Sequence, residues 1–114
     1  MSANANAVTR QRVDGATIVC LQGEVDLSWS QQVRRAVLDA FADGVPVGVD
    51  LAGVGYIDSS GIAALVEGLQ LGRARGQRFA LVAPSDAVRA VLELARLDRV
   101  FTIVDSAAAV GAAT

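Results

Sequence analysis

A short polar segment interrupts an otherwise apolar stretch in the middle of the chain. Residues 54–66 read VGYIDSSGIAALV, with Asp58, Ser59, Ser60 and Gly61 at the centre. An acid, two hydroxyls and a glycine between a strand and a helix are ordinary turn and N-cap residues. On this interpretation, Ser59 or Ser60 accepts a hydrogen bond from an amide in the first turn of the helix.

The same position also suits a phosphorylation site. A serine at the start of a helix is exposed at the carboxyl end of a strand, where α/β sheets place their sites. A phosphate on Ser59 would meet free N–H groups and the positive end of the helix dipole, so the fold could tolerate it. It would present about −1.5 to −2 additional charges to a partner surface. We therefore expect Ser59 to switch binding without changing the fold.

A second polar segment lies upstream of the first. Residues 21–30 read LQGEVDLSWS and place Asp26 directly after a predicted strand. If this strand neighbours the strand that ends before Asp58, Asp26 approaches the turn that holds Ser59. Asp26 reads equally well as a turn acid. Trp29, the only Trp of the chain, indicates either packing at the edge of the first helix or an anchor on a partner surface, because Trp is enriched at binding hot spots.

The composition excludes most enzyme chemistry. The chain has no His, no Lys and a single Cys, Cys20. A Ser-His-Asp triad, a Schiff-base lysine and a zinc site of the usual kind therefore cannot be built. The net charge of −2 gives no basic footprint for direct nucleic-acid binding, and no apolar run reaches the roughly 18 residues of a membrane span. We expect a cytoplasmic binding domain that is not an enzyme and has no cofactor or metal.

Hydrophobic patterns predict one α/β domain with the element order β β α β α β α β α. Asp14-Gly15 predicts a hairpin between the first two strands. Ser28 or Ser30 is expected to cap the first long helix and Ser85 the third. Alternating strands and helices imply parallel pairing with right-handed crossovers. The strands are expected at residues 8–13, 17–23, 45–51, 78–83 and 100–104, with residues 52–56 as a turn.

Three segments together resemble the STAS domain family, named for sulfate transporters and anti-sigma factor antagonists. They are LQGEVD at residues 21–26, VDLAGVGYIDSSGIAALV at 49–66 and LARLDRVFTI at 94–103. The resemblance covers residues 8–110 as one STAS domain and leaves residues 1–7 as a flexible N-terminal tail. It implies an α/β, SpoIIAA-like fold, with a mixed, mostly parallel sheet of four to five strands and about four helices.

The resemblance also implies a function, that of an anti-sigma factor antagonist. In the stand-alone bacterial members, the unphosphorylated domain binds an anti-sigma factor that is also a GHKL-type serine kinase, and so frees a sigma factor for transcription. The kinase phosphorylates the first serine of the D-S-S-G motif, which is Ser59 here, and a PP2C-type phosphatase reverses the reaction. By the same match, we expect Asp26, Asp58, Ser60 and Gly61 to form the partner-binding surface, with Trp29 beside them as an anchor.

Other functions remain open on the sequence alone. Some small STAS proteins are accessory subunits that bind the ATPase of a phospholipid ABC transporter, and they keep a similar turn. Others are scaffold components of stressosome-type assemblies. The GEVD segment at residues 23–26 favours the antagonist over the transporter subunit. A small-ligand or nucleotide binder is disfavoured because the chain has no glycine-rich phosphate loop.

Overall fold

Asp14 and Gly15 form the tight turn that starts the sheet. Both have positive φ angles, 47° and 82°, which suit an Asp-Gly pair in a two-residue hairpin. The turn joins β1 (Ala7–Val13) to β2 (Ala16–Val25) as an antiparallel pair, which confirms the predicted hairpin. The computed structural model describes residues 6–112, so residues 1–5 of the predicted N-terminal tail lie outside the described residues.

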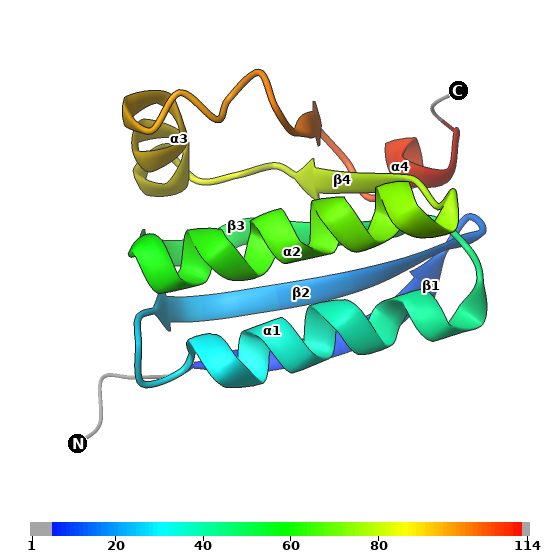
Figure 1. Cartoon of the computed structure of the whole chain (residues 1–114), viewed down its shortest axis with the longest axis horizontal. Helices are drawn as coiled ribbons and strands as arrows, with labels where there is room; N and C mark the ends of the chain where they lie inside the picture. Colours follow the sequence, from blue (N-terminus) through cyan, green and yellow to red (C-terminus); the bar gives the residue numbers. More distant parts are fainter. Residues whose placement is uncertain (1–5, 113–114) are drawn as a thin grey trace.

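The remaining strands extend the sheet in chain order. Strands β3 (Val47–Ile57), β4 (Phe79–Val82) and β5 (Thr102–Val104) are each parallel to the preceding strand. The resulting order is β1-β2-β3-β4-β5, with only β1 antiparallel to its neighbour (Figure 1). The predicted α/β class with a mixed, mostly parallel sheet is therefore confirmed.

Helices cover the two faces of the sheet unequally. Figure 1 shows α1 and α2 lying side by side across one face. The larger core cluster lies beneath them and includes Val19, Val49 and Leu81, and a smaller cluster around Ile18 and Val110 lies on the other face. This division follows from the alternation of side chains along a strand. The helices are α1 (Ser30–Asp39), the 3-10 helix η1 (Ala40–Asp43), α2 (Ser59–Arg75), α3 (Asp86–Leu94) and α4 (Ala108–Ala112).

Strand β3 is longer than the sequence predicted. The expected turn at residues 52–56 is wrong, because β3 continues to Ile57. Pairing with β2, which has 10 residues against 11 in β3, holds this segment extended, with Gly53 opposite Gln22. Two register shifts in the β2–β3 ladder accommodate the irregular sequence. The low strand preference of glycine is thus overcome by the neighbouring strand.

Helix ends follow the sequence signals only in part. Ser85 caps α3 as predicted, and its Oγ accepts a hydrogen bond from the Val88 N–H at 3.2 Å. The predicted capping of α1 by Ser28 or Ser30 is wrong, because the N-cap residue is Trp29 and no side chain caps this helix. The carbonyl oxygen of Asp26 instead accepts the Ser30 N–H at 2.8 Å. The turn before α1 therefore satisfies the first of the amides that the helix leaves without an intrahelical partner.

Small residues on α2 allow this helix to pack closely against its neighbours. A Cβ atom added at Gly68 would lie 2.8 Å from the Phe79 ring and 2.8 Å from Cγ1 of Val37. The exposed side of α2 is linked to α1 by Arg34, whose Nε donates to both carboxylate oxygens of Glu67 at 2.8 Å. This ion pair is solvent-exposed and contributes little to stability. The close packing at glycine therefore fixes where α2 lies on the sheet.

We expect Gly68→Ala to lower the free energy of unfolding by about 1–3 kcal/mol, because the added methyl group overpacks the contact between α2, Phe79 and Val37. Urea denaturation followed by circular dichroism measures the change. Gly55→Ala is the matched control, since an added Cβ there has no heavy atom within 4 Å. A Gly68→Ala protein as stable as the wild type would show that the contact is loose.

Candidate functional site

The polar segments predicted from the sequence lie together at the carboxyl edge of the sheet. Val25, the last residue of β2, pairs with Ile57, the last residue of β3. The Asp58 N–H also donates to the Val25 carbonyl oxygen at 3.1 Å. Residues 26–28 and 58–60 are therefore adjacent, at the end of the sheet where α1 and α2 begin (Figure 1).

Asp58 is the N-cap of α2. Its backbone is extended, with φ −106° and ψ −172°. Its Oδ1 accepts hydrogen bonds from the Ser60 N–H at 2.9 Å, the Gly61 N–H at 3.1 Å and the Ser60 hydroxyl at 2.6 Å. A single carboxylate oxygen thus binds two amides that the helix leaves without an intrahelical partner.

The predicted capping by Ser59 or Ser60 is therefore wrong, and the two serines have different roles. The Ser60 hydroxyl is partly buried and donates to the Asp58 carboxylate. Ser59 is the first residue of α2 and is exposed, and its hydroxyl makes no hydrogen bond to any residue between 6 and 112. The turn consequently presents Ser59 to solvent while Asp58 and Ser60 hold the start of the helix.

The electrostatic surroundings of Ser59 also differ from the prediction. The amides of Ser60 and Gly61, which were expected to receive a phosphate, already bind Asp58. A phosphate on Ser59 would therefore lie beside a carboxylate, and the two like charges would repel each other. The positive end of the helix dipole offsets part of this repulsion.

Asp58 is held in its charged form. The hydrogen bond from the Ser60 hydroxyl is the largest cause that lowers its pKa below the ordinary value for Asp. Partial burial acts in the opposite direction, and the N–H groups of Gly61, Ser60 and Leu27 lower the pKa further. Each donor favours the ionised carboxylate because it binds the negative charge directly.

Asp26 forms a turn of the same kind. Its Oδ1 accepts hydrogen bonds from the Ser28 N–H at 3.0 Å and from the Ser28 hydroxyl at 2.6 Å. The Asp-x-Ser pattern occurs at residues 26–28 and again at residues 58–60, and this repeat is the sequence signal that could have revealed the likeness of the turns. The middle residue of the first turn is Leu27, whose side chain is 74% exposed and which the sequence analysis did not single out.

Two residues expected on the partner surface lie inside the fold. Trp29 is only 6% exposed and belongs to the larger core cluster. Of the two interpretations of Trp29, packing at the start of α1 is therefore correct, and an anchor on a partner surface is not. Gly61 is buried as well, and a Cβ atom there would lie 2.6 Å from Cγ1 of Ile57. Gly61 thus allows α2 to begin close to β3. Asp26, Asp58 and Ser60 are partly exposed.

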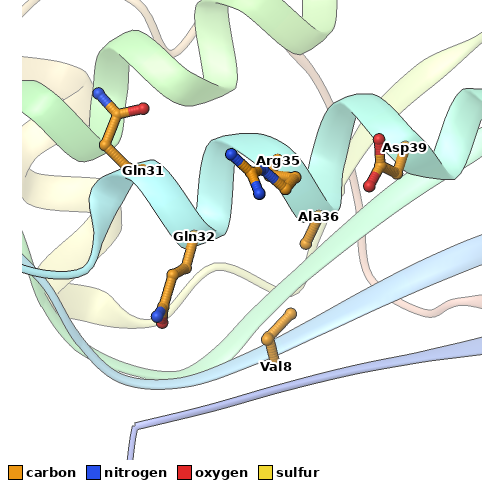
Figure 2. Close-up of a pocket in the computed structure, with 6 residues that line it drawn as sticks. All are labelled: Val8, Gln31, Gln32, Arg35, Ala36 and Asp39. Atoms are coloured by element: carbon orange, nitrogen blue, oxygen red, sulfur yellow. The ribbon is translucent and has the colours of Figure 1, made fainter.

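Ser59 does not line the hollow shown in Figure 2. The hollow measures about 480 Å³ and is formed by Val8 of β1 and by side chains of α1 that include Arg35 and Asp39. Within residues 6–112, no group of three or more His, Cys, Asp or Glu side chains could hold a metal ion. No helix in that range is long and apolar enough to cross a membrane. The chemistry available at the carboxyl edge is therefore that of an exposed hydroxyl among carboxylates.

Comparison with known proteins identifies relatives of the whole domain. A family model described as "Mlab, STAS domain" matches residues 8–105. An anti-sigma factor antagonist from Mycobacterium paratuberculosis superposes with a TM-score of 0.80 at 24% identity, covering 93% of this chain and 91% of that one. A Thermotoga maritima protein assigned as an anti-sigma factor antagonist gives 0.75 at 28% identity, covering 90% and 89%.

The anti-sigma factor antagonist SpoIIAA has the same fold. Its unphosphorylated form superposes with a TM-score of 0.72 at 20% identity, covering 89% of this chain and 90% of SpoIIAA. A phosphorylated form from Bacillus superposes with a TM-score of 0.67, also at 20% identity, and covers 89% and 93%. At these identities the likeness supports the fold, and the predicted SpoIIAA-like architecture is confirmed.

We expect Asp58→Ala to lower the midpoint of thermal unfolding by about 4 °C or more at pH 7, because α2 loses its N-cap. Asp58→Asn should lose much less, since an amide oxygen can accept the same N–H groups. Asp105→Ala removes an exposed acid of the same charge and serves as the control. Equal midpoints for wild type and Asp58→Ala would contradict the capping role.

The effect of Asp58→Ala should also depend on pH. Because folding lowers the pKa of Asp58, the ionised carboxylate stabilises the fold at pH values above the ordinary Asp pKa of about 3.9. This stabilisation is lost as the pH falls through the lower pKa of the folded state. The midpoints of wild type and Asp58→Ala should therefore converge in acid. A difference that grows below pH 4 would contradict the assignment.

Proposed function

We propose, because the chain belongs to the STAS domain family, that it is an anti-sigma factor antagonist switched off by phosphorylation of Ser59. The observation that carries the proposal is the exposed Ser59 at the first position of α2, with Asp58 rather than Ser59 binding the free amides. The serine can then be modified without loss of the bonds that begin the helix.

The proposed partner is an anti-sigma factor that is also a GHKL-type serine kinase. The comparisons support this class of partner, because several similar structures are anti-sigma factor antagonists and SpoIIAA exists in phosphorylated and unphosphorylated forms. Binding of the unphosphorylated chain would release a sigma factor for transcription in the cytoplasm. A PP2C-type phosphatase would restore the binding form.

The chain needs no catalytic group of its own for this role. The kinase supplies the base, the magnesium ions and the positioning of the ATP phosphates. Ser59 needs only to be accessible, and the neighbouring Asp26, Asp58 and Ser60 give the surface its shape and charge. The lack of His and Lys in the sequence, which excludes many enzymes, does not affect a kinase substrate.

The switch would act through local electrostatics. A phosphate on Ser59 adds about −1.5 to −2 charges at an edge that already carries Asp26 and Asp58. If a partner binds this edge in a dry contact, the added charge must be desolvated against nearby carboxylates, and the complex weakens. The sheet and the core beneath α2 do not need to change.

The test uses purified GHKL-type serine kinases from the same organism, each incubated with the full chain, ATP and Mg²⁺. We expect one of them to phosphorylate Ser59 and to bind the unphosphorylated chain. Ser59→Ala should retain binding and accept no phosphate. Ser59→Asp should bind about tenfold more weakly or worse while keeping its circular dichroism spectrum. Mass spectrometry locates the phosphate, and calorimetry measures binding.

Ser106→Asp is the matched control, because it adds the same charge at an exposed serine that precedes α4. Phosphate only on another residue would defeat the Ser59 assignment. Binding to none of these kinases, together with binding to the ATPase of a phospholipid ABC transporter, would instead support the accessory-subunit function. A large homogeneous assembly formed by the chain alone would support a scaffold.

A further inference from the structure

The two Asp-x-Ser turns place Leu27 and Ser59 in equivalent positions. In each turn the aspartate Oδ1 accepts hydrogen bonds from the N–H and the hydroxyl of the serine two residues later, and both hydroxyl bonds measure 2.6 Å. The middle residue makes neither bond and is exposed in both cases. Leu27 therefore occupies the position in the first turn that Ser59 occupies in the second.

The two middle residues lie on the same small part of the surface. The turns follow neighbouring parallel strands whose last residues, Val25 and Ile57, are paired. The Leu27 N–H also contributes to the lowered pKa of Asp58, the residue directly before Ser59. A partner that contacts the Ser59 hydroxyl therefore also meets residue 27.

Leu27, unlike the exposed Tyr56 of β3, lies within one of the two turns at this edge. It is 74% exposed, whereas the neighbouring Trp29 and Val25 are buried in the core. A single exposed leucine is common on protein surfaces and needs no explanation by itself. The position of Leu27 is what suggests a role in binding. A standard interface covers about 800 Å² on each partner, so one centred on Ser59 would also cover residue 27.

We propose that Leu27 is the apolar anchor with which the serine kinase that modifies Ser59 binds this chain. The inference rests on the proposed function and identifies the contact that supplies affinity at its site. Burial of a leucine side chain favours binding by removing apolar surface from water. A phosphate on Ser59 would keep that surface hydrated, so the same modification that adds charge would also weaken the Leu27 contact.

The test measures binding of the full chain to the GHKL-type kinase that phosphorylates Ser59 in the assay described above. We expect Leu27→Ala to weaken binding about tenfold and Leu27→Met to bind within about threefold of wild type. Thermal unfolding should be almost unchanged, because Leu27 is not part of either core cluster. Val100→Ala is the control, since Val100 is 42% exposed and lines a hollow together with Arg73, near the opposite end of α2.

The outcomes separate this inference from the proposed function. If the wild type binds the kinase and is phosphorylated, and Leu27→Ala binds equally tightly, then Leu27 is not the anchor and the proposed function still stands. Equal losses for Leu27→Ala and Val100→Ala would also overturn it, because the effect would not be local. Wild type that binds none of these kinases would overturn the proposed function and the inference together.

Discussion

The bonds accepted by the Asp58 carboxylate determine how the rest of the edge can be used. One oxygen, Oδ1, binds the Ser60 N–H, the Gly61 N–H and the Ser60 hydroxyl, so two amides of the first turn of α2 are satisfied without the Ser59 hydroxyl. The same bonds lower the pKa of Asp58 and keep it charged. Ser59 is left exposed next to a fixed negative charge. A helix start that used Ser59 as its cap would instead tie the reactive hydroxyl to the stability of the helix.

The parallel pairing of β2 with β3 places a second polar turn beside Ser59. It brings the turn at residues 26–28 beside the turn at residues 58–60, so that two carboxylates, one free hydroxyl and one exposed leucine share an edge. The buried Gly61 lets α2 begin against β3. Ser59 therefore lies at the surface and outside the core cluster, and a charge added there can change binding without entering the core.

The sequence was sufficient for the element order, because the Asp14-Gly15 turn, the Ser85 cap and the apolar stripes are local signals. It was insufficient where tertiary structure chose among equivalent candidates. Any residue of an Asp-Ser-Ser run can cap a helix, and the extended backbone of Asp58 selects that residue. The sequence of residues 52–56, with two glycines, is typical of a turn, but pairing with β2 holds these residues in a strand. Trp29 could pack or protrude, and only the assembled core places it inside.

The most direct measurement is an NMR titration of the Asp58 carboxyl carbon, recorded on the unmodified chain and on the chain phosphorylated at Ser59. The account predicts a pKa below the ordinary Asp value in the unmodified chain, with the Ser60 and Gly61 amides shifting at the same midpoint. It predicts a higher pKa after phosphorylation, because the phosphate repels the carboxylate. An ordinary pKa in the unmodified chain, or a value that the phosphate leaves unchanged, would contradict the account.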